Sequence, residues 1–406
     1  MKLAVLTQYY PPEIGAPQRR LSSLVGHFIR AGHEVQILTA MPNYPLGRIH
    51  DGYGGMSSSE VIDGARVSRT FIYPTQKTDF PRRLANYFSF VLSSAAIGTF
   101  RLERPDFLLV ESPPLFLGLS GFWLSRVKRT RLIFNVSDLW PETAVHLGVV
   151  REGSALHRLS QRLESFCYSR SWLITGQSRE IVGDIARRFP RARTYRLSNG
   201  VDCASFGAER ATPEARAAIA ERDDDCVALY AGLHGMAQGL GQLLDAADVL
   251  RNERGPKMVF IGTGPMKDDL VRDAGERRLD AVRFMDARPA ADLPPLLASA
   301  DILLVPLGMS IPGAVPSKLY EAMASGRPVL LIATGEAADI VNECRAGIVV
   351  APGDLQGVVT ALRTLRDDPA LRAELGANGR RAAEAHFDRS EIARRFIDML
   401  ESEART

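Results

Sequence analysis

The chain has 406 residues, of which 46% are hydrophobic and 24% are charged, with a formal net charge of +3. This length excludes a single hydrophobic core and predicts two domains, and the composition is ordinary for a soluble globular protein. Residues 1–200 hold 26 Lys and Arg against 15 Asp and Glu, whereas residues 201–406 hold 24 against 32. The basic first half suits an anionic membrane face or an acidic acceptor. No basic helix is interleaved with stacking aromatics, so no nucleic-acid partner is expected.

The cysteines and the first residues indicate a cytoplasmic protein. Cys167, Cys203, Cys226 and Cys344 are far apart and form no Cys-x-x-Cys pair, which predicts reduced thiols. Polar Tyr-Pro-Pro-Glu arrives by residue 13, directly after a short apolar stretch, and this argues against a signal peptide.

The first elements predict a βαβ unit. Residues 2–7 read as a strand, residues 17–31 as an amphipathic helix and residues 34–39 as a second strand. The connecting loop, 8–16, has no Gly-x-Gly-x-x-Gly pattern, so a dinucleotide site is disfavoured. The long Pro-, Gly- and Tyr-rich loop 41–55 is a candidate acceptor surface.

The next segments predict a hairpin and an unusual helix. Residues 60–70 form a hairpin pattern around Asp63-Gly64. Residues 84–100 contain no charged side chain and are flanked by arginines, yet the segment is short for a membrane span. Two interpretations remain open, a helix packed within the domain and a helix lying partly in the membrane interface.

Two loops of the first half are predicted to lie at carboxyl ends of parallel strands. Strand 107–110 ends at Glu111-Ser-Pro-Pro, and strand 131–136 ends at Ser137-Asp138-Leu-Trp-Pro-Glu. The Asp138 carboxylate could take the proton of an acceptor or cap the following helix. Strands at 172–175 and 194–198 then complete the first domain, and a turn at 199–202 crosses to the second.

The second half opens with a charged connector and surface helix over 211–225, followed by a strand at 226–231 and a Gly-rich loop at 232–241. Asp223, Asp224 and Asp225 precede that strand rather than follow it, so we interpret them as solvated surface and expect no metal site. Further strands are predicted at 259–261 and 282–285. The helices from residue 354 onward end in one with an apolar stripe.

Residues 301–333 predict a strand, a loop, a helix and a second strand. Ser317 is a good N-cap for a helix beginning at Lys318, and Gly326 is a good stop. In an open parallel sheet this helix start lies at the ligand-binding edge, where N–H groups, dipole and Lys318 suit a phosphate. Glu321, one turn further, could accept hydrogen bonds from ribose hydroxyls. The pattern indicates a nucleotide-diphosphate site, and the alternative is an ordinary capped helix with solvated Lys and Glu.

Several motifs in order resemble the retaining GT-B glycosyltransferases of family 4. The second half of the family's C-terminal signature is matched by Glu321-Ala-Met-Ala-Ser-Gly-Arg-Pro-Val, and the preceding Pro-Ser-Lys is similar to a bacterial branch that assembles O-antigen and capsule repeats with amino sugars. The remaining matches span most of the chain. They are Tyr9-Tyr-Pro-Pro-Glu-Ile-Gly-Ala, Gly32-His-Glu-Val, Pro42-Asn-Tyr-Pro-Leu-Gly, Ser112-Pro-Pro, Asp138-Leu-Trp-Pro-Glu, Asn199-Gly-Val-Asp, Tyr230-Ala-Gly and Ala237-Gln-Gly-Leu.

The resemblance implies an α/β fold of two Rossmann-like domains facing across a cleft. The domains would be residues 1–200 on the acceptor side and 201–385 on the nucleotide-sugar side, with a C-terminal helix, 386–406, crossing back to the first. It also implies transfer of a sugar, hexosyl or amino sugar, from a nucleotide-diphosphate donor to an acceptor hydroxyl with retention of configuration and without metal or other cofactor. A UDP-sugar is favoured, and cell-surface polysaccharide or glycoconjugate assembly is the expected context.

The resemblance also supplies the predicted site residues. The catalytic residues are Asp138, Lys318 and Glu321. The donor-binding residues are Gly15, Ala16, Gly232, His234, Arg288, Pro316, Ser317, Lys318, Leu319 and Glu321. The acceptor-side residues are Tyr44, Pro113 and Trp140. Gly15 is expected to let the backbone approach the donor phosphates closely.

Three positions depart from the family pattern. Gly313 stands where the first Glu of the signature holds donor-sugar hydroxyls. Leu233 or His234 stands near the usual Arg, and Gln238 near the usual Lys, so we expect Lys318, backbone N–H groups and Arg19 or Arg20 to compensate.

Two other classes of function stay open at the level of the sequence. A nucleotide-sugar epimerase of the same fold would share the nucleotide site, and a non-catalytic sugar-nucleotide binding protein would fit the missing Glu and cations. The expected acceptor is a lipid-linked saccharide at the membrane surface, reached from the cytoplasm by a protein peripheral on the inner face. The sugar and the oligomeric state are left open.

Overall fold

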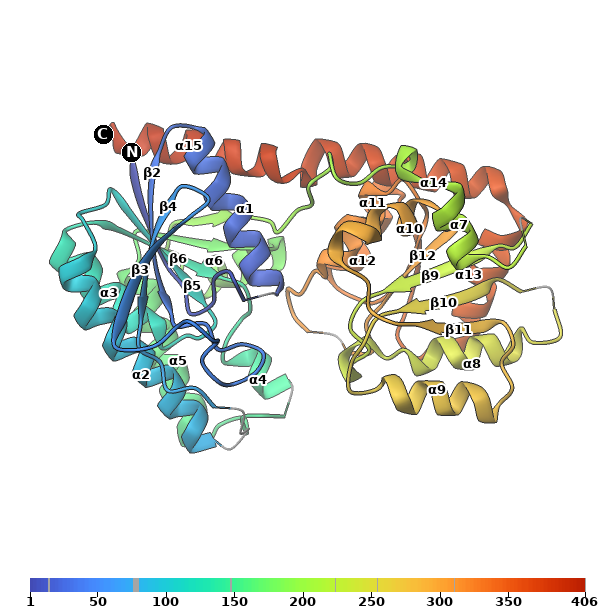
Figure 1. The fold of residues 1–406 in the computed structure, drawn as a ribbon, viewed down its shortest axis with the longest axis horizontal. Coiled ribbons are helices and arrows are strands. Elements are labelled where there is room, and N and C mark those ends of the chain that lie inside the picture. Colours follow the sequence, from blue (N-terminus) through green and yellow to red (C-terminus); the bar gives the residue numbers. More distant parts are fainter. Residues whose placement is uncertain are drawn as a thin grey trace. The chain divides into compact units, whose positions relative to one another are not determined.

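The computed structural model describes residues 1–13, 15–75, 80–146, 148–222, 224–253, 255–309 and 311–405. The chain forms two compact α/β units, residues 1–199 with 390–406 and residues 200–389. Figure 1 shows that each unit has a central sheet with helices on both faces. The predicted fold class of two Rossmann-like units is confirmed.

The first unit is built on an eight-stranded sheet in the order β3-β4-β2-β1-β5-β6-β7-β8. Every described pairing is parallel except β3 with β4, which is the hairpin predicted around Asp63-Gly64. Both turn residues have positive φ, 48° and 86°, as a two-residue hairpin of this type requires. The strands are β1 (Lys2–Leu6), β2 (Glu34–Ala40), β3 (Ser57–Ile62), β4 (Ala65–Thr70), β5 (Phe107–Ser112), β6 (Arg131–Val136), β7 (Leu173–Gly176) and β8 (Thr194–Arg196).

Both faces of this sheet are buried, so its central strands read as continuous apolar runs. Alternate residues of β1 enter different cores: Ala4 and Leu6 pack with one helical layer, and Leu3 and Val5 with the other. The first layer contains α2 (Phe80–Arg101), α3 (Leu117–Lys128), α5 (Ala155–Arg170) and α6 (Arg179–Arg188), and the second contains α1 (Ala16–Arg30) and α15 (Arg389–Ala404). The short α4 (Glu142–His146) follows β6.

The C-terminal helix α15 packs on the first unit. Its apolar stripe of Ala393, Phe396, Ile397 and Leu400 is buried in the core that it shares with α1. The Phe396 ring lies 6.2 Å from that of Phe28 and 5.4 Å from that of Tyr195. The last residues of the chain therefore complete the core of the unit that contains the first residues.

The second unit has a six-stranded sheet in the order β11-β10-β9-β12-β13-β14, and all described pairings are parallel. Its strands are β9 (Val227–Ala231), β10 (Lys257–Ile261), β11 (Val282–Met285), β12 (Ile302–Pro306), β13 (Val329–Ile332) and β14 (Gly347–Val350). Its helices are α7 (Pro213–Ile219), α8 (Gly241–Val249), α9 (Lys267–Glu276), α10 (Leu293–Ala298), α11 (Ser317–Ala324), α12 (Glu336–Cys344), α13 (Leu355–Asp367) and α14 (Pro369–Ala382).

One local prediction needs correction. The connector helix α7 covers only Pro213–Ile219, because Asp225 closes a separate loop by accepting the backbone N–H groups of Glu221 and Arg222. Asp223 lies outside the described residues. Across the part of the chain that the structure describes, no helix is long and apolar enough to cross a membrane.

Candidate functional site

Three loops meet at the carboxyl edge of the second sheet. They follow β9, β10 and β12, which are neighbours in the sheet. The N–H groups of Gly232 and His234 donate to the carbonyls of Ile261 and Thr263 at 2.8 and 2.9 Å, which joins the first two loops. The N–H of Gly308 donates to Ala237 O at 2.8 Å and joins the third. Backbone hydrogen bonds thus hold the three loops together.

Lys318 lies on this edge, in the first turn of α11. Its Nζ lies 5.7 Å from the centre of the Tyr230 ring. A Cβ added to Gly232 would come within 1.9 Å of Lys318 Cε and 2.6 Å of its Nζ. Gly232 has φ +156°, a conformation that favours glycine. The absence of a side chain at 232 therefore provides the space in which the Lys318 side chain lies.

The start of α11 differs from the prediction by one residue. Pro316, with φ −66° and ψ 135°, occupies the N-cap position, and Ser317 is the first helical residue. Ser317 is therefore not the cap, and no side chain caps this helix. Because a helix start leaves N–H groups without intrahelical partners, an uncapped start of this kind suits an anion. Leu319, predicted to bind the donor, is fully buried in the core beneath this turn.

Glu321 matches the family signature, whereas Gly313 departs from it. Glu321 is half-buried one turn into α11. Gly313 is buried with φ +73°, in a turn closed by the Ala314 N–H donating to Ile311 O at 3.1 Å. That left-handed backbone favours glycine and would be strained with a glutamate. The backbone of this loop therefore favours the glycine at position 313.

His234 is buried below the Gly-rich loop. Its ring is fully buried between Tyr230 and Phe284, at 5.8 and 6.0 Å between ring centres. Within the described residues, neither ring nitrogen has a hydrogen-bond partner. Burial lowers the pKa of His234, and the charges of Lys267 and Lys318 lower it further. The imidazole is therefore neutral, and it does not replace the positive charge of the arginine expected near this position.

Lys267 and Gln238 also lie near this edge, and each bonds a neighbouring group of the protein. Lys267 Nζ bonds Asp286 Oδ1 at 2.7 Å and Met285 O at 3.1 Å, and this bond lowers the pKa of Asp286. Gln238 Oε1 accepts the N–H of Gly235 at 3.2 Å, so it shapes the loop. Arg288 is exposed beyond β11.

In the first unit, Arg20 belongs to a buried polar network. Its guanidinium lies 2.5 Å from Glu111 Oε1 and 3.3 Å from Ser137 Oγ. Glu111 also accepts from Ser137 and Asn135, at 2.6 and 2.8 Å. Arg20 is therefore paired with Glu111 within the first unit, and its compensation for missing donor-site cations stays a prediction. Arg19, its neighbour, is exposed.

Asp138 follows β6 at the carboxyl edge of the first sheet. Burial raises the pKa of its carboxyl, the Glu111 charge raises it further, and the Arg20 charge opposes this shift. The next helix, α4, begins only at Glu142, so Asp138 does not cap it. The structure thus removes the capping alternative and leaves a carboxyl group that holds its proton more tightly than an exposed aspartate.

The loops of residues 8–15 and 41–55 are joined by a residue that sequence reasoning missed. Glu13 is buried and accepts the backbone N–H groups of Asn43, Tyr44 and Tyr10 at 2.9, 2.8 and 3.2 Å. An acidic residue within a Pro-rich loop was the available signal. Tyr44 is 46% exposed and meets Tyr9 edge-on at 5.7 Å.

The remaining predicted residues of the first unit lie near this same edge. Gly15 is the N-cap of α1 with an extended backbone, and a Cβ there would meet the end of the Gln18 side chain. Its own conformation therefore does not require glycine. Ala16 is the first residue of α1, Pro113 is exposed after β5, and Trp140 packs partly against the core.

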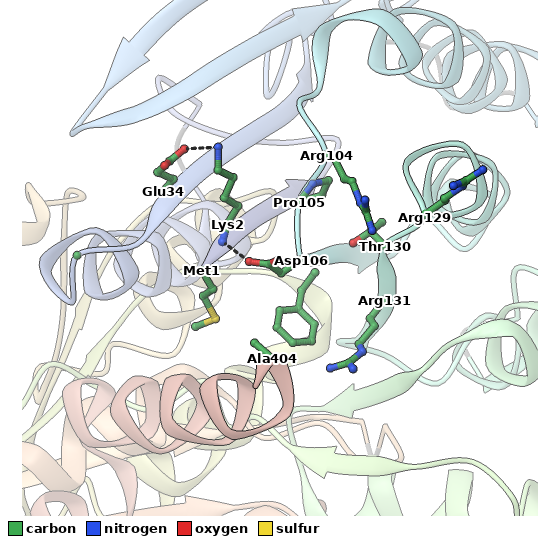
Figure 2. A pocket seen from close by; sticks show the side chains of 12 residues that line it. Met1, Lys2, Glu34, Arg104, Pro105, Asp106, Arg129, Thr130, Arg131 and Ala404 are labelled. Carbon is green, nitrogen blue, oxygen red and sulfur yellow. Dashed lines mark hydrogen bonds and ion pairs between the residues drawn. The ribbon is translucent and has the colours of Figure 1, made fainter. Parts of the chain in front are cut away.

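A pocket at the opposite, amino edge of the first sheet does not coincide with these residues. Figure 2 shows Lys2, Asp106 and Arg131 among the residues lining it. Its polar groups largely engage one another: the backbone N–H of Lys2 donates to Asp106 at 2.7 Å, and the Lys2 ammonium lies 3.1 Å from Glu34. The predicted site residues follow the carboxyl ends of the strands, so this pocket is not part of the predicted site.

Comparison with known proteins agrees with the arrangement in both units. Residues 15–200 match the model of the glycosyl transferase 4-like domain, and residues 211–382 match that of glycosyl transferases group 1. The chain belongs to the family 4 glycosyltransferases. The putative colanic acid biosynthesis glycosyl transferase WcaI of Escherichia coli is 26% identical to this glycosyltransferase over 98% of the chain and 99% of its own length.

Solved structures agree on the GT-B fold. Sucrose-phosphate synthase from Thermosynechococcus elongatus superposes with a TM-score of 0.77 at 18% identity, covering 99% of this glycosyltransferase and 98% of its own chain. HepE from Anabaena, in complex with UDP, superposes with a TM-score of 0.73 at 18% identity, covering 99% of this chain and all of its own. At these identities the likeness establishes the fold.

Proposed function

We propose that this glycosyltransferase moves a sugar from a UDP-sugar to an acceptor hydroxyl with retention of configuration, in the assembly of a cell-surface polysaccharide or glycoconjugate. The observation that carries the proposal is the position of Lys318, at the uncapped start of α11 and in the space left by Gly232. A lysine and a helix start at the carboxyl edge of a parallel sheet suit a diphosphate.

The proposed chemistry is a substitution at the anomeric carbon. The bond from that carbon to the phosphate oxygen breaks, and a bond to the acceptor oxygen forms on the same face of the sugar. The acceptor proton passes to the departing phosphate. Lys318 and the N–H groups of the helix start stabilise the negative charge that develops on the diphosphate. Glu321 accepts hydrogen bonds from the ribose.

This proposal assigns no step to a metal ion, because Lys318 and the helix dipole supply the positive charge. Full turnover in the presence of a strong chelator is the expected result, and restoration of a lost activity by Mg²⁺ or Mn²⁺ would contradict it. Asp138 is proposed as a polar group that binds the acceptor hydroxyl, while the acceptor proton passes to the departing phosphate.

The choice of UDP and of the pathway is supported by the relatives. HepE has been solved with UDP, and WcaI is named for colanic acid biosynthesis. We propose that the acceptor is a lipid-linked saccharide met at the inner face of the membrane. Release of UDP that depends on an added lipid-linked acceptor is the expected signature, whereas tight UDP binding without turnover on any acceptor would favour a non-catalytic binding protein.

The direct test is Lys318→Ala. Loss of a preorganised charge on the leaving group is expected to lower kcat by about 10²–10³-fold. Lys257→Ala is the matched control, because Lys257 starts β10 at the amino edge of the same sheet and pairs with Glu221 at 3.1 Å. Thermal unfolding should show both variants folded. Normal turnover in Lys318→Ala would refute the diphosphate assignment.

A further inference from the structure

The outward sides of α2 and α3 are apolar. Between residues 84 and 100, the exposed positions of α2 are 85, 88, 92, 96 and 100, and all carry apolar side chains. Phe100 is 87% exposed, Leu92 69% and Phe88 39%. The outward positions Leu119, Trp123 and Val127 of α3 repeat the pattern, with Trp123 53% exposed. A helix on the surface of a globular protein ordinarily presents polar side chains to water.

The inward sides of α2 and α3 pack closely on the sheet. The inward sides of both helices carry glycines that bring them close to the sheet. A Cβ on Gly98 would lie 2.7 Å from Leu38 Cδ2, and one on Gly121 would lie 2.5 Å from Val110 Cγ2. The inward sides also carry large residues, among them Phe90 and Leu124, which are buried in the core, so these helices are apolar on both sides.

The two helices present one continuous surface. Contacts join them along their length: Phe88 meets Phe116 at 4.9 Å between ring centres, and the Ser94 and Ser120 hydroxyls lie 2.8 Å apart. Near their C-terminal ends Trp123 Nε1 donates to Thr99 Oγ1 at 3.0 Å. Figure 1 shows α2 and α3 side by side in the helical layer of this unit. We name this surface the apolar face. It consists of Phe88, Leu92, Phe100, Leu119, Trp123 and Val127.

The charges near the apolar face are mainly positive. Residues 80–102 and 112–137 contain no Asp or Glu. A cationic rim surrounds the C-terminal ends of the two helices. It consists of Arg101, Arg104, Arg126, Lys128 and Arg129. Figure 2 shows Arg104 and Arg129 at the pocket next to these helix ends.

The acidic groups next to the rim are already engaged. Glu103 lies 2.5 Å from Arg66 and 3.4 Å from Lys2, and its pKa is lowered to about 2 by these partners. Asp106 accepts the backbone N–H of Lys2. The rim therefore keeps a positive potential around exposed apolar side chains.

We propose that the apolar face and its cationic rim dock this protein on the surface of an anionic phospholipid membrane. Aromatic and aliphatic side chains enter the boundary between headgroups and acyl chains, and the arginines and lysine contact lipid phosphates. A Trp near the rim is typical of such a boundary. A second copy of the chain fits less well, since face-to-face pairing would bring two cationic rims together without acids to neutralise them.

The test is sedimentation of the full chain with vesicles of phosphatidylcholine alone or of phosphatidylcholine and phosphatidylglycerol in equal parts. We expect binding to the anionic vesicles and little to the neutral ones. Leu92→Ser combined with Phe100→Ser should weaken binding at least about tenfold, because two large apolar side chains no longer enter the lipid. Arg126→Glu combined with Arg129→Glu should do the same, and high salt should weaken binding of the parent protein.

The controls are matched substitutions on the other unit. Val249→Ser with Val271→Ser changes side chains of α8 and α9 that are 41% and 44% exposed, and Arg381→Glu changes an exposed cation of α14. These variants should bind vesicles as the parent does, with unchanged melting temperatures in all variants.

Two results would overturn the proposal. One is no binding to anionic vesicles. The other is a concentration-dependent dimer that Leu92→Ser with Phe100→Ser abolishes, which would assign the face to a second copy. Vesicle binding requires neither donor nor acceptor, so its failure is distinguishable from failure of the proposed glycosyl transfer, which is read by UDP release in detergent.

Discussion

The relation between Gly232 and Lys318 gives a sharp prediction. Alanine at 232 would place Cβ 1.9 Å from Lys318 Cε, whereas non-bonded carbons sit at about 3.5–4.0 Å. The end of the Lys318 side chain must therefore move by roughly 1.5–2 Å to restore a normal carbon–carbon distance. A misplacement of this size at a reacting group costs about 10²-fold in rate.

Gly232→Ala should also lower stability modestly. Its φ of +156° lies in a region that suits glycine, and forcing another residue into such a conformation costs of order 1–3 kcal/mol. A shift of several degrees in melting temperature is therefore expected, with the fold retained. The rates of the parent protein and of Gly232→Ala should be compared at a temperature below both melting transitions, so that unfolding does not contribute.

The decisive assay is a double-mutant cycle on UDP affinity and UDP release. If Gly232 acts by housing Lys318, the Gly232→Ala and Lys318→Ala variants should lose similar amounts, and the double variant should lose little more than Lys318→Ala alone. For UDP affinity each loss is expected to be about 10–100-fold, the value of a charge-assisted hydrogen bond. Independent losses that multiply in the double variant would refute the coupling between these two residues.

Three further predictions concern the first unit. Arg20→Met should destabilise the protein by about 3–5 kcal/mol, because it leaves the Glu111 carboxylate buried without its partner, and Arg20→Met with Glu111→Leu should recover much of that loss in a denaturant titration. Since the folded-state pKa of Asp138 lies above 3.8, the folded protein binds this proton more tightly than the unfolded chain, and stability falls as pH rises from 3.8 through the folded-state pKa. Asp138→Asn should therefore melt higher at neutral pH and show a flatter melting profile over that interval, and an unchanged profile would contradict the shift. Phe396→Ala should cost about 3–5 kcal/mol in the first unit, and spectroscopic probes placed in the second unit should report an unchanged transition.

The sequence predicts helices and strands well where apolar runs are bounded by Gly or Pro. β12, α11 and β13 lie within two residues of their predicted bounds, and the hairpin follows from Asp63-Gly64. The prediction of Ser317 as N-cap failed because Pro316, with its fixed φ, takes that position first. Several helices were not predicted, among them α5, α9 and α12, of 16, 10 and 9 residues.

The sequence predicted that the start of α11 belongs to the candidate site. It did not predict which individual charged side chains are buried or paired. Arg19 and Arg20 are adjacent in the sequence and about 100° apart on α1, so only the folded structure shows which one faces inward. The partner of Arg20 is Glu111, which is 91 positions away. The backbone at His234 likewise packs closely on Gly264, where an added Cβ would lie 2.4 Å from His234 O. Such choices are made by tertiary contacts, which a local pattern does not contain.

The second unit has little positive charge near Lys318. His234 is neutral because of its burial, Lys267 is bonded to Asp286, and Gln238 holds the Gly-rich loop through Gly235. The Tyr230 ring, whose centre lies 5.7 Å from Lys318 Nζ, attracts the ammonium through its π-face. We expect Lys318→Arg to lower turnover, measured as UDP release, because a planar guanidinium cannot take the geometry of the ammonium that lies beside Gly232.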